Sequence, residues 1–351
     1  MLRATCLLAF ALPAAATLRV AFLSDLHVGE DCGCPYDGSE SCPSVVNDRR
    51  AVARINALDP LPDAVIVTGD LTSSSAPQQW TKVADILTSL RAPIYPAIGN
   101  HDIWPYRLVP GAGCNASEAP GPTGDLSFQS TFGAALRASP NISGYDPHPV
   151  RNLHNTTSSY QNWQLTLTGD GGARIAFLAG DWSTREHAPP PNLGVPGWAE
   201  RGLSDFPGGP LPWLRDRLAA EAALPPSRRP DALFLVQHQP VTCPFYIPDA
   251  LFCFGVEDKA LLESALQEHW PREAWWGVVA GHNHLFLNQS TPFLDWPGFR
   301  ELETSAAKGD GLDKDAASAF TVMSFEGARV SLVEEHSYSL SRSEWSVRAG
   351  L

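Results

Sequence analysis

The chain has little positive charge. Its 351 residues include 25 lysines and arginines against 38 aspartates and glutamates, so the formal net charge is −13 at pH 7. Binding of nucleic acid through a broad basic surface needs the opposite balance, and this class of function is not expected. An anionic ligand would need a local positive charge, which a bound metal ion can supply. The hydrophobic content of 44% is enough for a globular core.

Long apolar runs are also missing beyond the N-terminal segment, so no transmembrane segment is expected. Residues 1–16 combine Arg3 with an apolar run and small residues at Ala14 and Ala16. This is the pattern of a secretory signal peptide that is cleaved near Ala16, and an ordinary buried N-terminal segment is the alternative. We therefore expect a protein that is secreted, or lumenal in the secretory or lysosomal pathway.

Cysteine is scarce, and no two cysteines have the CxxC spacing that is typical of structural zinc sites. Removal of the signal peptide leaves six, and an even number in an exported chain favours disulfides. We predict that Cys243 pairs with Cys253, and that Cys42 pairs with at least one of Cys32 and Cys34. Export also permits glycosylation at Asn-x-Ser/Thr sequons. Four sequons begin at Asn115, Asn141, Asn155 and Asn288.

Internal repeats are absent, and short apolar runs alternate with helical patterns. Runs of this kind are typical of strands buried on both faces, and their alternation with helices favours an α/β fold with much parallel sheet. The predicted strands cover residues 19–24, 63–68, 93–98, 173–179, 231–237 and 276–280. The predicted helices cover residues 45–58, 78–90, 211–224 and 258–270.

We expect one domain over residues 17–340. Residues 111–161 are rich in Gly, Pro, Ser and Asn and are predicted to be a loop-rich, glycosylated insertion. Residues 189–210 are predicted to be a second loop. The patterns between 303 and 339 predict a closing hairpin of a sheet, and residues 341–351 are expected to be a polar C-terminal tail.

Five of the predicted strands end in residues that can bind metal. In an open α/β sheet the carboxyl ends of the strands form the crevice where ligands bind, so these residues are expected to meet at one place. The blocks are Asp25-Leu26-His27, Gly69-Asp70, Gly99-Asn100-His101-Asp102, His238 and Gly281-His282-Asn283-His284.

The residue types in these blocks fit one purpose. Carboxylate and amide oxygens together with imidazole nitrogens suit zinc, manganese or iron. The candidate ligands are too many for one ion, but a bridging Asp would let two ions bind roughly 3.5–4 Å apart. The alternative is that each His is a satisfied polar residue of the fold. Five of the ten histidines lie at these strand ends, which argues against that alternative.

The order of the five blocks resembles the calcineurin-like metallophosphoesterase superfamily, and the resemblance extends from Ala21 to His284. It implies a four-layer αββα sandwich with a two-metal site at the carboxyl ends of the strands. It also implies a role for each residue of the motif. Asp25, His27 and His284 would bind the first metal, Asp70 would bridge, Asn100, His238 and His282 would bind the second, His101 would lie near the reacting phosphate, and Asp102 would orient the His101 imidazole.

The resemblance implies a metal-dependent phosphoester hydrolase, either a phosphatase or a phosphodiesterase, that acts on a small phosphoester. A hydroxide bridging the two metals would attack phosphorus, and His101 would donate a proton. The alternatives are a non-catalytic secreted binding protein that retains the fold, and an enzyme of the protein-phosphatase type. All the ligands are present, which argues against the first, and the disulfide-permissive compartment argues against intracellular phosphoproteins as substrates.

The branch within the superfamily is less sharply defined. Purple acid phosphatases carry Tyr three residues after the bridging Asp, where this chain has Ser73, and they lack a counterpart of His27. Enzymes similar to acid sphingomyelinase have Glu after Gly-Asn-His, where this chain has Asp102. The pattern looks most similar to the cyclic-nucleotide-phosphodiesterase-like branch, which includes other specificities. Monoester and diester substrates therefore both stay open, as do the metal identity and the oligomeric state.

Overall fold

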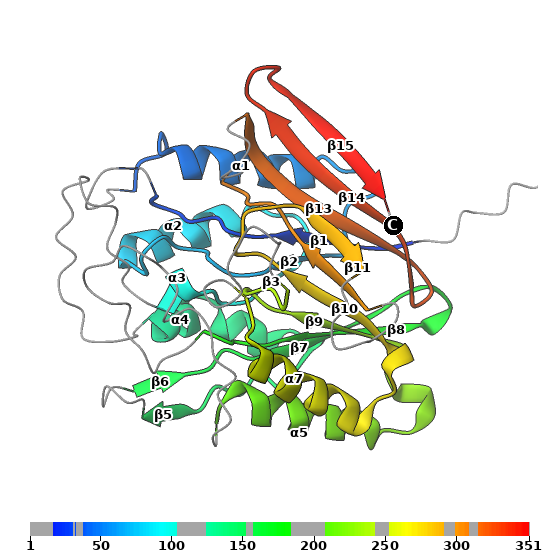
Figure 1. Cartoon of the computed structure of the whole chain (residues 1–351). Helices are drawn as coiled ribbons and strands as arrows, with labels where there is room; N and C mark the ends of the chain where they lie inside the picture. Colours follow the sequence, from blue (N-terminus) through cyan, green and yellow to red (C-terminus); the bar gives the residue numbers. More distant parts are fainter. Residues whose placement is uncertain are drawn as a thin grey trace, which may run out of the picture.

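Two β-sheets lie face to face, with helices covering their outer faces (Figure 1). The computed structural model describes residues 17–30, 32, 38–103, 124–151, 157–183, 208–242, 253–290, 299–308 and 315–350. One sheet has the strand order β15-β14-β13-β1-β2-β3, and the other has the order β11-β12-β10-β9-β8-β7-β4. The predicted four-layer αββα sandwich is therefore confirmed.

The first sheet holds three of the predicted strands. They are parallel and adjacent, and the predicted hairpin continues the sheet from the other side of β1 in antiparallel orientation. The strands are β1 (Leu18–Leu23), β2 (Ala64–Val67), β3 (Ile94–Pro96), β13 (Ala316–Glu326), β14 (Arg329–Ser339) and β15 (Glu344–Gly350).

The second sheet holds the other three predicted strands. Together with β12 they run parallel, and antiparallel strands close both edges. The strands are β4 (Ile142–Ser143), β7 (Trp163–Thr168), β8 (Arg174–Ala179), β9 (Ala232–Val236), β10 (Trp275–Ala280), β11 (Leu287–Ser290) and β12 (Arg300–Glu303). A separate pair consists of β5 (Pro149–Arg151) and β6 (Thr157–Ser159).

The four predicted helices are present. The first two pack on the first sheet and the last two pack on the second. They are α1 (Pro43–Asn56), α2 (Pro77–Leu87), α5 (Pro210–Ala222) and α7 (Val256–His269). Proline opens three of them, a position where its missing N–H costs no helical hydrogen bond. The short helices are α3 (Asn100–Ile103), η1 (Asp170–Gly172), η2 (Pro226–Arg228) and η3 (Arg272–Ala274).

Aromatic side chains fill the space between the sheets. Phe177 stacks on Phe234 with 5.0 Å between ring centroids, and Phe325 meets both rings edge-on. Phe22 of β1 lies 6.2 Å from Phe177 across the interface. All four side chains are buried. These ring contacts join strands of the two sheets across their interface.

The prediction for residues 111–161 needs correction. The stretch 111–161 is less loop-like than predicted, because its described part contains α4 (Gly124–Ala138) and the strands β4 to β6. Phe128, Phe132 and Leu136 are spaced as one buried helical face, but the Ser, Gly and Gln between them conceal the pattern. Residues 104–123 and 152–156, like the predicted signal peptide at 1–16, lie outside the described residues.

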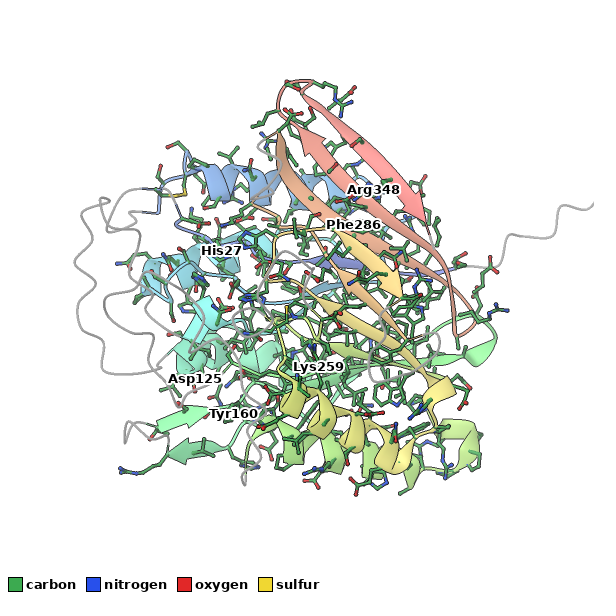
Figure 2. The ribbon with its side chains drawn as sticks, in the orientation of Figure 1. His27, Asp125, Tyr160, Lys259, Phe286 and Arg348 are labelled. Carbon is green, nitrogen blue, oxygen red and sulfur yellow. A yellow bond between two sulfur atoms is a disulfide. The ribbon has the colours of Figure 1, made fainter. Side chains whose placement is uncertain are left out.

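The predicted C-terminal tail is wrong over most of its length, since residues 344–350 form β15 and pair with β14. Most of its side chains are exposed, so this edge strand lacks the apolar run that reveals a buried strand. Arg348 holds it in place, with Nη2 2.6 Å from Glu335 Oε2 and its guanidinium over the Phe286 ring at 4.7 Å (Figure 2).

Cys32 and Cys42 form a disulfide, as predicted, with 5.2 Å between their Cα atoms. Cys253 is disulfide-bonded too, but its predicted partner Cys243 lies outside the described residues. Within the part of the chain that the structure describes, no helix is long and apolar enough to cross a bilayer.

Candidate metal centre

The two central ligand loops of the first sheet leave adjacent parallel strands. Leu23 at the end of β1 pairs with Val67 at the end of β2, so the residues that follow emerge side by side. The loops then hydrogen-bond to each other, with Asp25 N donating to Gly69 O at 3.1 Å and His27 N donating to Asp70 O at 2.9 Å. The backbone of each loop thus fixes the position of the other.

The backbone of this region is strained. Seven non-glycine residues in the described part of the chain have positive φ, and five of them are candidate ligands. Left-handed backbone costs a non-glycine residue roughly 1–2 kcal/mol, and such strain concentrates at functional sites. The five are Asp25 (φ 52°), His27 (45°), Asp70 (50°), His282 (75°) and His284 (56°).

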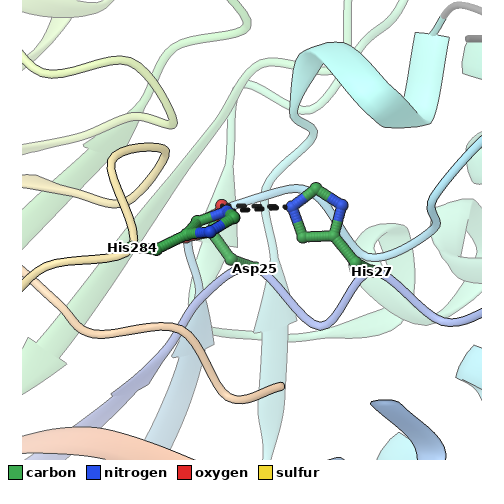
Figure 3. A group of neighbouring side chains, drawn as sticks. All are labelled: Asp25, His27 and His284. Atoms are coloured by element: carbon green, nitrogen blue, oxygen red, sulfur yellow. Dashed lines mark hydrogen bonds and ion pairs between the residues drawn. The ribbon is translucent and has the colours of Figure 1, made fainter. Parts of the chain in front are cut away.

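Asp25, His27 and His284 form the first ligand group (Figure 3). Asp25 Oδ1 lies 3.7 Å from His27 Nε2 and 3.3 Å from His284 Nε2, and the two histidine nitrogens are 3.1 Å apart. Both Asp25 and His27 are buried. The three predicted ligands of the first metal therefore meet, although they come from both sheets.

Asp70, His238 and His282 form the second group. Asp70 Oδ2 lies 3.0 Å from His238 Nε2, which lies 3.1 Å from His282 Nδ1. The same Asp70 oxygen is 3.4 Å from His27 Nε2 of the first group, so it reaches both. Asn100 is buried near this group, with its Oδ1 3.5 Å from Nε2 of Gln239, the residue after His238.

Two glycines let the loops approach this closely. A Cβ atom on Gly99 would overlap Oδ1 and the backbone nitrogen of Asp70, and a Cβ atom on Gly281 would overlap Ser24 Oγ. Any larger residue at either position would push apart the strand ends that carry Asp70 and Asp25. The glycines of these blocks therefore serve close packing of the ligand loops.

His101 lies beside the first group. Its ring is 4.6 Å from the His27 ring, and its backbone nitrogen donates to Asp70 Oδ1 at 2.9 Å. Its Nδ1 is 2.7 Å from Ser73 O, and because a carbonyl oxygen can only accept, this nitrogen carries the proton. His101 also forms a compact group with His27 and Asp70. Its geometry allows both a role toward substrate and a role as a ligand, and its role stays a prediction.

The described contacts of the Asp102 carboxylate are with the ligand loops, and its predicted role of orienting the His101 imidazole stays a prediction. Among the described contacts, its carboxylate accepts from the backbone nitrogens of Leu71 (3.1 Å), Thr72 (2.8 Å) and Gly99 (2.9 Å), and the Ser73 carbonyl holds the His101 imidazole. Burial and the charge of Asp70 raise the pKa of Asp102 to about 7, against the effect of these donors. Asp102 is therefore the residue that joins the β2 and β3 loops.

Asp102→Ala is expected to lower the free energy of unfolding by about 3 kcal/mol, because a buried donor left without its acceptor costs about 1–3 kcal/mol. Urea unfolding followed by circular dichroism measures the change. Asp102→Asn keeps one acceptor oxygen and should lose less. A loss below about 0.5 kcal/mol in the alanine variant would show that the carboxylate does not hold the loops.

The charges of the cluster favour ionised carboxylates. Burial would raise the pKa of Asp25, but the charge of His284 and hydrogen bonds from His27 and His284 hold it well below its usual range. Burial lowers the pKa of His27 to about 3, so this imidazole is neutral, as a metal ligand must be. Burial would also lower the pKa of His238, but the charge of Asp70 raises it to about 9, so a metal ion that binds this imidazole would displace a proton from it.

The donor set fits two divalent cations. Two pairs of imidazole nitrogens face each other at 3.1 Å, next to two ionised carboxylates. His27 Nδ1 is buried without a hydrogen-bond partner in the described structure, so the ring depends on its Nε2 side for polar contacts. Neutral imidazole with carboxylate and amide oxygen is the mixture that zinc, manganese and iron accept.

A family comparison identifies the architecture. The model of the calcineurin-like phosphoesterases matches residues 18–286, which include all five blocks. This chain belongs to the calcineurin-like phosphoesterase family. All the residues of the two ligand groups lie within the matched range. Among curated proteins, none matches the chain in sequence.

Solved structures with the same fold share little sequence with this family member. Purple acid phosphatase PPD1 from yellow lupin (Lupinus luteus) seeds is 14% identical with a TM-score of 0.50, over 96% of this chain and 54% of its own. PhoD is 11% identical with a TM-score of 0.53, over 95% of this chain and 68% of its own. The chain thus spans about half the length of the lupin phosphatase, and these likenesses concern the fold.

Residues outside the predicted ligand set support this metallophosphoesterase centre, and one of them, Glu303, has no signal in the sequence. Ser24 Oγ donates to Asp25 Oδ2 at 2.5 Å, and Asn283, between two candidate ligands, donates to Glu303 Oε2 at 2.9 Å. Glu303 is buried, and burial raises its pKa well above the usual range. It lies at the end of β12, a strand the sequence does not predict, so it could be found only from the structure.

Proposed function

We propose that the protein is a secreted, two-metal phosphoester hydrolase that acts on small phosphoesters. The observation that carries the proposal is the position of Asp70 Oδ2, 3.4 Å from the first ligand group and 3.0 Å from the second. A single carboxylate oxygen that reaches both groups is the arrangement needed to hold two cations close together. The donor types favour zinc, manganese or iron.

Each residue then has a defined task. Asp25, His27 and His284 would hold the first cation, Asn100, His238 and His282 would hold the second, and Asp70 would contact both. When bound, the cations neutralise phosphate oxygens and make an attacking water more acidic. His101 protonates the leaving oxygen. Because Ser73 O accepts from its Nδ1, the proton that passes to substrate is carried by Nε2.

Secretion is part of the proposal. The Cys32–Cys42 disulfide supports an oxidising compartment, where such bonds persist. Of the four sequon asparagines, Asn141 is exposed and can accept a glycan, whereas Asn288 Oδ1 accepts from Arg300 at 2.7 Å. A glycan is therefore more readily accommodated at Asn141 than at Asn288.

A non-catalytic binding protein is the alternative function. Such a relative could lose ligands without penalty, but here the six His and Asp ligands converge and Asn100 is buried beside Gln239. The strained backbone at five of these positions supports the same conclusion, because a structural role alone does not favour it.

Four substrates separate these functions: p-nitrophenyl phosphate, bis(p-nitrophenyl) phosphate, a cyclic nucleotide and a phospholipid head-group ester. The purified protein is expected to hydrolyse at least one of them, to lose this activity in a chelator, and to regain it with Zn²⁺, Mn²⁺ or Fe²⁺. Activity that survives removal of all metal, or no hydrolysis of any substrate by metal-loaded protein, would contradict the proposal.

A further inference from the structure

The loop that follows a sixth strand, β12, also lies at the candidate metal centre. β12 runs parallel to β10, so its carboxyl end lies at the edge from which His282 and His284 emerge. The loop after it crosses from the second sheet to the first. Thr304 N donates to Ala280 O at 2.9 Å, and Ala307 N donates to Ser24 O at 2.8 Å. The residue that follows, Lys308, is therefore placed next to the ligand Asp25.

The position of Lys308 is fixed from three directions. Its backbone nitrogen lies 3.5 Å from Asp25 O, and its carbonyl accepts from Asn47 Nδ2 at 2.6 Å. Its ammonium forms an ion pair with Glu30. Glu30 is held in turn by its backbone nitrogen, which donates to His27 O at 2.9 Å. The pair thus joins the loop after β1 to the loop after β12.

The ion pair stands on the loop that carries His27, because Glu30 lies three residues further along the chain. Burial and then the charge of Lys308 lower the pKa of His27. Burial would raise the pKa of Glu30, but the charges of His27 and Lys308, with a smaller effect from His101, lower it to about 2. The Lys308 side chain is 15% exposed and that of Glu30 is 30% exposed, so solvent reaches the pair. A protein with a net charge of −13 thus places a lysine beside the candidate ligand Asp25.

We infer that Lys308 binds a terminal phosphate oxygen of the substrate in place of Glu30, and that the enzyme therefore prefers phosphomonoesters. This inference rests on the proposed function and deepens it. A phosphomonoester has a second ionisation with a pKa of about 6 and carries close to two negative charges at neutral pH. A diester carries one. An ammonium beside the metals therefore favours the monoester, and Glu30 holds the ammonium in place until substrate binds.

A purely structural role for the Lys308–Glu30 ion pair predicts a different result from phosphate binding by Lys308. If the pair serves only to fasten the two loops together, removing either partner must have the same effect on every substrate. If Lys308 binds phosphate, then Lys308→Met must harm the monoester selectively, whereas Glu30→Gln removes a competitor for the ammonium. Lys82→Met is the matched control, because Lys82 also pairs with a glutamate, Glu40, and its side chain is also 15% exposed.

The measurement is kcat/KM for p-nitrophenyl phosphate and for its bis-ester. Lys308→Met should lower the monoester value about tenfold, the factor that a hydrogen bond to a charged group typically contributes. The bis-ester value should fall by less than about threefold, because the second charge is missing. Glu30→Gln should retain or raise the monoester value, and Lys82→Met should change neither. Equal losses for both substrates, or losses shared by Glu30→Gln, would overturn the inference.

Binding of inorganic phosphate to the metal-loaded protein, measured by calorimetry, tests the role of Lys308 without requiring that the protein hydrolyses a substrate. Lys308→Met should weaken phosphate binding about tenfold at unchanged metal content. If the metal-loaded wild type hydrolyses none of the four substrates named above, the proposed function fails, and the phosphate titration still decides the role of Lys308. An unchanged Kd for phosphate would overturn that role even in an active enzyme.

Discussion

Asp70→Asn is expected to reduce turnover by roughly a thousandfold, which is the upper range for loss of one preorganised electrostatic group. Asp70 Oδ2 lies within 3.4 Å of a ligand nitrogen in each group. A carboxylate offers two oxygens and a full charge to two cations that repel each other, whereas asparagine offers one oxygen and no charge. The same substitution is therefore expected to lower the metal content of both sites.

Metal content per chain, measured by mass spectrometry, distinguishes this bridging role from a role in one site. His27→Ala should mainly deplete the first site and His238→Ala the second, while Asp70→Asn should affect both. Circular dichroism is the control for folding, which should survive because a chain of this length can build its core without metal. Near-normal turnover with two bound metals in Asp70→Asn would remove the bridge from the mechanism.

His101→Ala is expected to reduce turnover about a hundredfold or more, which is the usual effect of losing a general acid. Metal content should stay at the wild-type value, because the other seven side chains supply the ligands. His269→Ala is the matched control. His269 ends α7, just before the amino end of β10, and so lies at the edge of the sheet opposite to the candidate site.

His101 also lies in a compact group with His27 and Asp70. The metal content of the His101→Ala variant is therefore the decisive value. Loss of a metal ion from His101→Ala would make His101 a ligand and leave the mechanism without its proposed acid. Unchanged metal with unchanged turnover would remove His101 from the chemistry altogether.

The ligand loops could be predicted from the sequence because the signals are local. A buried parallel strand such as β1 or β2 needs a continuous apolar run, and the ligands come directly after that run. The carboxyl ends of parallel strands of one sheet lie at one edge, so the five blocks indicated one site. In the structure three blocks follow strands of the first sheet and two follow strands of the second, and the two sets of strand ends meet. The same reasoning predicted the helices α1, α2, α5 and α7, whose buried faces follow the helical period, but not α4.

The parts that could not be predicted depend on tertiary contacts. β15 is a mostly exposed edge strand, so its sequence carries no apolar run. Asp102 follows His101 in the chain, which suggested a contact with the imidazole, but its carboxylate accepts from the loop after β2 and from Gly99 of its own loop. Lys308 is far from the ligands in sequence and reaches them because the loop after β12 crosses between the sheets.

The most direct test of the two-metal account is a metal titration of protein from which all metal has been removed. Zn²⁺ or Mn²⁺ is added in steps, while bound metal and hydrolysis of p-nitrophenyl phosphate and its bis-ester are followed in parallel. The account predicts binding of about two ions per chain and hydrolysis that appears as the second ion binds. Full activity after one equivalent, or activity with no metal at all, would contradict it.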